Sequence, residues 1–110
     1  MGKPYVPDTG DIVWLKFDPQ AGREQAGHRP ALVLSPAAYN SKTSLMLCCS
    51  LTTQENGYPF EVRAGDEAGS VVLSDQVKSV DWRRREAKHK GRVSPEVLRE
   101  VRAKIQALIG

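Results

Sequence analysis

The chain has 110 residues, of which 40% are hydrophobic and 26% are charged, and its formal net charge is +3. This length predicts one compact domain over residues 1–110, and the balance of residue types excludes a disordered, collagen-like or mucin-like chain. No apolar stretch approaches the roughly 18 residues of a membrane-spanning helix and the N-terminus lacks the apolar core of a signal peptide, so we expect a cytoplasmic protein with no membrane contact.

The first half of the chain alternates strand-forming stretches with polar loops. Strands are predicted at residues 11–17, 31–34 and 45–51, with Pro30 at the first position of the second strand. A polar loop is predicted at residues 18–29. The adjacent Cys48 and Cys49 lie within the third predicted strand, where neighbouring side chains point to opposite faces, so no disulfide between them is expected.

The second half begins with a turn at Asn56-Gly57 and continues with short predicted strands at residues 58–63, 70–73 and 76–82. A loop is predicted at residues 83–92, which contain six Lys or Arg and one Glu, a local charge of +5 against −2 for the rest of the chain. Such a segment is typical of a phosphate-binding surface, and also of a solvated loop.

Ser94 is a predicted N-cap and Pro95 a first helical residue, and the apolar residues that follow recur at helical spacing up to Gly110. This stripe is expected to pack against the strands, and part of it is available for a dimer contact. The predicted fold class is therefore mainly β with a C-terminal helix, built as a small antiparallel barrel.

Two polar segments adjoin predicted strands, at residues 23–30 and at Thr52-Thr53-Gln54. A hairpin between the second and third strands would bring both to one end of the sheet, where they can hold a phosphodiester. Arg29 suits phosphate oxygens and the Thr52 hydroxyl can donate to one of them, while Glu24 and His28 are the nearby groups able to transfer a proton.

RNA supplies its own nucleophile, the 2′-hydroxyl, so such a site needs no metal. His28 and His89 have no ligand at zinc-site spacing, and we expect neither a metal site nor a cofactor. Structural explanations remain open beside this interpretation: Arg29 as a surface salt bridge, Thr52 as a strand-end hydroxyl, His28 as a turn residue and Glu24 as a solvated carboxylate.

Collinear segments over essentially the whole chain resemble the MazF/PemK toxins of type II toxin–antitoxin modules. They are Tyr5-Val6-Pro7-Asp8 with Gly10-Asp11, residues 24–31 (EQAGHRPA), Leu34-Ser35-Pro36, Thr52-Thr53-Gln54, residues 57–62 (GYPFEV) and residues 75–79 (DQVKS). The resemblance implies a CcdB-like, SH3-like barrel that forms a homodimer. It also implies a metal-independent endoribonuclease that cuts single-stranded mRNA at short motifs, of ACA type in similar members, and halts translation.

By the same resemblance, Arg29 and Thr52 match the catalytic arginine and threonine, and Glu24 matches a loop acid linked to activity. The products would be a 2′,3′-cyclic phosphate and a 5′-hydroxyl. The partner would be an acidic, MazE-like antitoxin that blocks the RNA groove with its C-terminal segment. The residues expected to contact RNA are Arg23, Gln25, Thr53, Gln54, Asn56, Gln76, Lys78, Arg84, Arg85 and Lys88. The rival interpretations are a CcdB-like toxin that inhibits gyrase and a non-catalytic nucleic-acid-binding barrel.

Overall fold

The computed structural model describes residues 4–17, 27–65 and 69–110. These residues form six strands and two helices in the order β1 (Asp11–Phe17), β2 (Gly27–Val33), α1 (Ala37–Thr43), β3 (Leu45–Thr52), β4 (Glu61–Arg63), β5 (Val71–Asp81), β6 (Lys88–Arg92) and α2 (Pro95–Ile109). No helix among these residues is long and apolar enough to cross a membrane.

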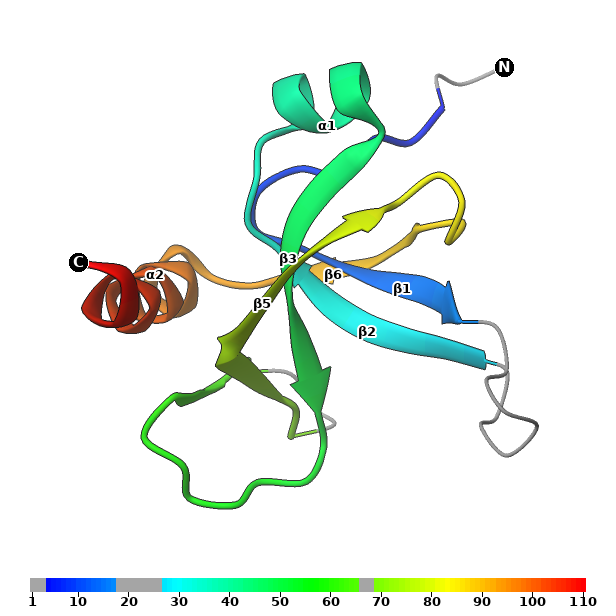
Figure 1. The fold of residues 1–110 in the computed structure, drawn as a ribbon. Coiled ribbons are helices and arrows are strands. Elements are labelled where there is room, and N and C mark those ends of the chain that lie inside the picture. Colours follow the sequence, from blue (N-terminus) through cyan, green and yellow to red (C-terminus); the bar gives the residue numbers. More distant parts are fainter. Residues whose placement is uncertain (1–3, 18–26, 66–68) are drawn as a thin grey trace.

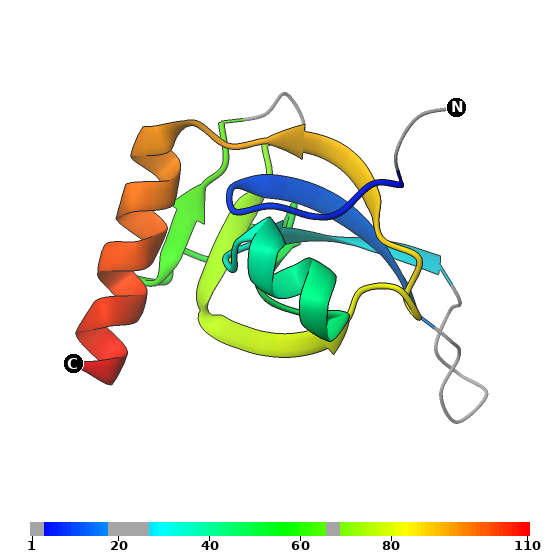
Figure 2. The ribbon, with the colours of Figure 1, turned by 90° about the horizontal axis from the view of Figure 1, so that it is seen from above.

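All six strands belong to one sheet with the order β4-β5-β3-β2-β1-β6, and every neighbouring pair is antiparallel. The sheet is strongly curled into a half-barrel, with the β1–β2 pair projecting away from α2 (Figure 1). Helix α2 stands at one side of the sheet against β4 and β5, well away from α1 (Figure 2). The expectation of a small antiparallel barrel with a C-terminal helix is confirmed.

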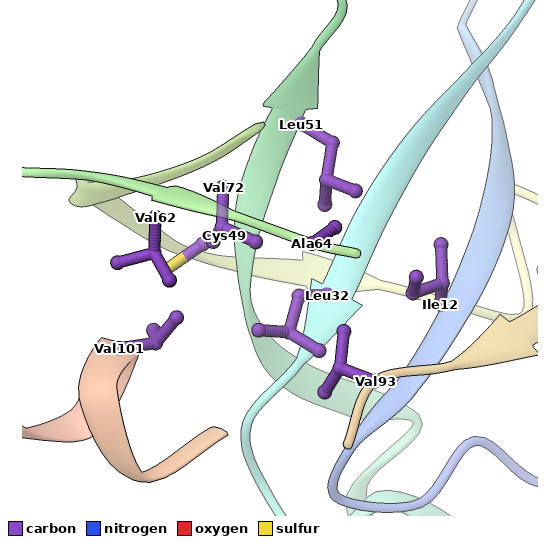
Figure 3. Close-up of a cluster of buried hydrophobic side chains, with 9 residues drawn as sticks. All are labelled: Ile12, Leu32, Cys49, Leu51, Val62, Ala64, Val72, Val93 and Val101. Atoms are coloured by element: carbon purple, nitrogen blue, oxygen red, sulfur yellow. The ribbon is translucent and has the colours of Figure 1, made fainter. Parts of the chain in front are cut away.

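Both faces of the central strands are apolar, because their residues alternate between two separate clusters. The α2-side cluster lies under the C-terminal helix (Figure 3) and contains Ile12, Leu32, Cys49, Leu51, Val62, Ala64, Val72, Val93 and Val101. The opposite cluster contains Val13, Leu15, Ala31, Val33, Met46, Cys48, Val80 and Trp82. Strands buried on both faces read as continuous apolar runs, which explains the sequence of β2 and β3.

Helix α2 begins and ends where the sequence predicts. The Ser94 side chain accepts a hydrogen bond from the Val97 amide, Pro95 follows at the first helical position, and Gly110 is the C-cap. Val101 is fully buried in the α2-side cluster, whereas Leu108 and Ile109 in the last turn are 51% and 75% exposed. The apolar stripe is therefore split between a buried part and an exposed end.

Several predicted boundaries are wrong. Strand β2 starts at Gly27, inside the predicted loop, and β4 contains only residues 61–63 of the predicted 58–63. The two strands predicted at 70–73 and 76–82 form the single strand β5, and the predicted basic loop contains β6 at Lys88–Arg92. Pairing with β1 makes β6 a strand despite its four polar or charged side chains, since a sheet edge needs only backbone bonds.

Helix α1 was not predicted, because it has no apolar periodicity. Asn40 is its one buried residue, and polar contacts hold the helix in place. The Asn40 amide donates to the carbonyl oxygens of Pro7 and Ser35 at 2.8 and 3.0 Å, and the Trp82 indole donates to the Asn40 carbonyl oxygen at 2.9 Å.

Candidate functional site

The register of β2 against β3 brings the two polar segments together. Ala31 lies opposite Ser50, Leu32 opposite Cys49, and Val33 opposite Cys48. The ladder ends at Ala31, but the same register continued by two residues sets Arg29 opposite Thr52. Directly opposed residues of antiparallel strands point to the same face, so both side chains extend the face of the opposite cluster beyond its apolar part.

A cavity of about 370 Å³ occupies this position. It is lined by Leu15, Arg29, Pro30, Ala31, Ser50, Leu51, Thr52, Leu73, Gln76 and Lys78. Among the described residues, this lining contains two cations and no carboxylate, together with the hydroxyls of Ser50 and Thr52. An apolar floor with convergent donors and a positive charge suits an anion such as a phosphodiester. We call this cavity the Arg29–Thr52 pocket.

The end of β3 and a bend in β5 shape the pocket. The backbone amide of Gln54 donates to Thr52 Oγ1 at 3.1 Å, which leaves the hydroxyl hydrogen of Thr52 available for another acceptor. On β5, the pairing with β3 shifts between Cys49 and Leu51, so the four residues 73–76 lie opposite Ser50. This irregularity carries Leu73 and Gln76 into the lining, as bulges commonly re-aim side chains.

His28 precedes Arg29 in β2 and therefore points to the other face of the strand. There it lines a separate cavity of about 330 Å³ with Trp14 and Lys88. Lys90 approaches the same tryptophan, with its Nζ 5.3 Å from the ring centroid. The structure thus places His28 and Lys88 together, but does not bring either of them to the Arg29–Thr52 pocket.

Arg84 and Arg85 lie in the turn after β5 and line a cavity of about 580 Å³. This cavity is less suited to an anion, because Asp81 and Glu86 also line it and the Glu86 carboxylate pairs with Lys16 at 3.5 Å. The basic segment is therefore divided among several environments rather than forming one patch. Arg92, for example, pairs with the buried carboxylate of Asp11.

The remaining predicted contacts lie on two loops. Thr53, Gln54 and Asn56 are exposed in the segment between β3 and β4, which leaves the sheet directly after Thr52. Arg23, Glu24 and Gln25 lie outside the described residues, in the connection between β1 and β2. The proximity of Glu24 to the pocket therefore stays a prediction.

Neither cysteine joins a site. Burial raises the pKa of the Cys48 thiol to about 11 and that of the Cys49 thiol to about 12. Both cysteines are buried thiols that form no disulfide. Within the described part of the chain, no group of three or more His, Cys, Asp or Glu side chains is placed to hold a metal ion.

The predicted site residues do not include Ser50, which lines the pocket, or Glu61, which begins β4. Ser50 is two residues before Thr52 in β3, so strand alternation places it on the same face, and this signal was available in the sequence. Glu61 accepts hydrogen bonds from the backbone of the loop that follows Thr52. Glu61 lies within the GYPFEV segment that carries the family resemblance, but no pattern in that segment indicates that its carboxylate binds the loop.

The chain is similar to known proteins over nearly its whole length. Residues 8–109 match the family model described as PemK-like, MazF-like toxin of type II toxin-antitoxin system. The chain is 59% identical over 107 residues to the endoribonuclease toxin MazF of Escherichia coli (strain K12), covering 96% of each chain. It is 38% identical over 110 residues to the endoribonuclease toxin ChpB of the same organism, covering 93% of each.

Solved MazF structures are also similar to this chain. The fold matches a chain in the MazE-MazF (Form-II) crystal structure from Deinococcus radiodurans with a TM-score of 0.92 and 52% sequence identity, covering 97% of this chain and 98% of that one. MazF (Form-I) from the same organism matches with a TM-score of 0.85 and 52% identity, covering 97% and 99%. The chain therefore belongs to the PemK/MazF family of type II toxin–antitoxin toxins and is a MazF-type endoribonuclease toxin.

Proposed function

We propose that this toxin cleaves single-stranded mRNA at short sequence motifs, of ACA type, in the Arg29–Thr52 pocket. The 2′-hydroxyl of the RNA attacks the adjacent phosphorus and the bond to the 5′-oxygen of the next nucleotide breaks. The products are a 2′,3′-cyclic phosphate, or the 3′-phosphate formed from it, and a 5′-hydroxyl. The single observation that carries this proposal is the convergence of Arg29 and Thr52 on one cavity that Lys78 also lines.

The residues of the pocket have complementary roles in this reaction. The Arg29 guanidinium neutralises the charge that develops on the phosphoryl oxygens, since it donates from two nitrogens and keeps its proton. The Thr52 hydroxyl donates to a non-bridging oxygen, because its own oxygen is already engaged by the Gln54 amide. Lys78 adds positive charge from the facing strand, and Gln76 supplies an amide for base or phosphate contact.

Proton transfer requires a further group, and the position of His28 favours Glu24 for this role. His28 faces away from the pocket across β2, whereas Glu24 belongs to the connection that leads into β2. A carboxylate near the 2′-hydroxyl acts as the general base. Arg23, Gln25, Thr53, Gln54 and Asn56 then contact the bases from the two loops that flank the site.

Two partners follow from two different surfaces of the protein. The neighbours described as MazE-MazF complexes support a MazE-like antitoxin as a partner. In this proposal the antitoxin is acidic, and its C-terminal segment crosses the cationic pocket and excludes RNA. We also propose a homodimer. Leu45, Leu47 and Val77 share one face of the β3–β5 pair and are 37%, 42% and 41% exposed, which suits contact with a second copy.

Cleavage of mRNA in the cytoplasm would inhibit translation and growth. The Arg29–Thr52 convergence favours this enzyme over the two rival interpretations, since neither gyrase inhibition nor passive RNA binding needs a phosphodiester pocket of this composition.

The test is incubation of the purified protein with a defined single-stranded RNA in EDTA, followed by sequencing of the new 5′ ends and analysis of both termini. We expect metal-independent cleavage at one short motif, leaving 5′-hydroxyl ends. Arg29→Ala, prepared identically, controls for contaminating nuclease. Intact RNA with the wild type, or 5′-phosphate products, would contradict the proposed chemistry.

A further inference from the structure

The segment of residues 53–60 joins β3 to β4 and contains neither helix nor strand. Figure 1 shows it leaving the end of β3 and sweeping round to β4. Residues 53–59 are exposed, and within the described structure the side chains of Thr53, Gln54 and Asn56 make no hydrogen bond. An exposed loop that starts directly after Thr52 and offers free amides is well placed to contact RNA bases.

This loop is nevertheless held in a defined conformation by Glu61, the first residue of β4. The Glu61 carboxylate accepts hydrogen bonds from three successive backbone amides: Asn56 at 3.1 Å, Gly57 at 3.0 Å and Tyr58 at 3.3 Å. Gly57 has a φ of +74°, which lets the chain turn so that these amides converge. Convergent backbone N–H groups form a concave anion site, and a carboxylate inside it makes charge-assisted hydrogen bonds.

Other contacts fix the two ends of the same loop. The backbone amide of Gln54 donates to Thr52 Oγ1. Arg63 forms a two-point ion pair with Glu55, with both N–O distances at 3.2 Å. Near β4, Lys104 of α2 donates to the Pro59 carbonyl oxygen at 2.6 Å. The middle, residues 56–58, depends on Glu61.

We propose that Glu61 is a positioning residue for base recognition. By fixing residues 56–58, its carboxylate holds Asn56 and its side-chain amide at a set distance from Thr52, next to Gln54, whose own backbone amide bonds to Thr52 Oγ1. An amide that carries both donor and acceptor can read the edges of an unstacked base. Because the loop is ordered before RNA binds, RNA binding does not have to supply the free energy of ordering it.

This inference rests on the proposed function, and it makes a distinct prediction. Loss of the Glu61 carboxylate leaves the phosphodiester chemistry of Arg29 and Thr52 in place, so kcat at saturating RNA stays nearly constant. The KM for the preferred motif rises, and discrimination against single-base variants falls by about tenfold, the scale of one well-placed base contact. Glu61→Gln lies between the wild type and Glu61→Ala, since one acceptor oxygen remains.

The experiment compares the wild type, Glu61→Ala, Glu61→Gln and Glu100→Gln, an exposed carboxylate of α2 that serves as the charge-matched control. A random single-stranded RNA pool is sequenced both for cleaved ends and for molecules bound by the protein but uncleaved. Amide hydrogen exchange is measured by NMR on the same proteins. We expect faster exchange at Asn56, Gly57 and Tyr58 in Glu61→Ala, with unchanged exchange in the core strands, and loss of motif enrichment in both RNA fractions.

The two proposals fail separately in this design. A wild type that enriches a motif among bound molecules without cutting it overturns the cleavage proposal, while the Glu61 comparison in the bound fraction still decides the positioning role. Full motif enrichment by Glu61→Ala, despite faster loop exchange, overturns the positioning role. If Glu61→Ala does not fold, unchanged enrichment by Glu61→Gln with faster exchange at the three amides overturns it in the same way.

Discussion

The two faces of the central strands are built from alternate residues of the same sequences, yet they end differently. On the α2 side, Cys49 and Leu51 continue under Val62 and Val101, and the helix covers the face. On the opposite side, the apolar series through Ala31 and Cys48 gives way to Arg29 and Thr52 at an open cavity. One face is closed by the helix, and the other ends at an open, cationic cavity, where we propose that an anion binds.

Replacing Arg29 by Ala is expected to have the largest effect, confined to the open face. Loss of one group that stabilises developing charge lowers kcat by roughly 10²–10³-fold, or about 3–4 kcal/mol. The unfolding free energy should change by less than about 0.5 kcal/mol, because the side chain is exposed. Single-turnover cleavage and urea unfolding measure the two quantities. Cleavage at the wild-type rate by Arg29→Ala would contradict the assignment of the pocket.

Val101→Ala is the corresponding test of the closed face. This side chain is 0% exposed, so its truncation leaves a cavity in the α2-side cluster and costs about 2 kcal/mol of unfolding free energy. Activity per folded molecule should be unchanged. Leu108→Ala, on the same helix but 51% exposed, is the control and should cost less than about 0.5 kcal/mol. Equal losses in the two variants would show that α2 does not close the core as described.

Thr52→Val tests the point where the open face changes from apolar to polar, because the substitution keeps the shape of the side chain and replaces only the hydroxyl by a methyl group. We expect kcat to fall by about tenfold, corresponding to one hydrogen bond of about 1.4 kcal/mol. The backbone amide of Gln54 also loses its acceptor, so hydrogen exchange at this backbone amide should become faster. Ser50→Ala, in the same pocket, separates a general effect of polarity from the specific role of Thr52. A larger loss in Ser50→Ala would move the donor role to that residue.

Neutralising Arg84, Arg85 and Lys88 together tests whether RNA extends beyond the open face. Each side chain that binds a phosphate should, once neutralised, flatten the slope of log affinity against log salt by about 0.7 for a single strand. We expect a several-fold loss of affinity at low salt and little change in kcat. Fluorescence anisotropy at a series of salt concentrations measures the slope. A slope identical to that of the wild type would identify this segment as a solvated surface.

Asp81→Asn should have the smallest effect on stability, and this effect should disappear in acid. The Arg84 amide and the Ser44 hydroxyl donate to Asp81, which lowers the pKa of its carboxyl below the ordinary 3.8. The resulting stabilisation is present above pH 3.8 and is lost as the pH falls through the lower folded value. The Tm of Asp81→Asn should therefore be lower near pH 7 and approach that of the wild type below pH 3. Parallel Tm curves from pH 7 to 2 would contradict this.

Sequence reasoning succeeded where local patterns match tertiary environment. The alternating run at 11–17, the apolar β3 and the capped α2 are examples, as is the expectation that Arg29 and Thr52 meet at one end of a β2–β3 pair. It failed where tertiary contacts override local preference. Helix α1 depends on the buried amide of Asn40, and β6 is a basic segment that pairs with β1.

By itself, the sequence determined the fold class, the family resemblance and the two residue types suited to a phosphodiester, because hydrophobic periodicity and short motifs are local properties. The tertiary structure decided that His28 turns away from the pocket while Lys78 and Gln76 turn toward it, and that Glu61 orders the loop beyond Thr52. These outcomes depend on strand register and on a shift in β5, and neither property is encoded within one short stretch of the chain.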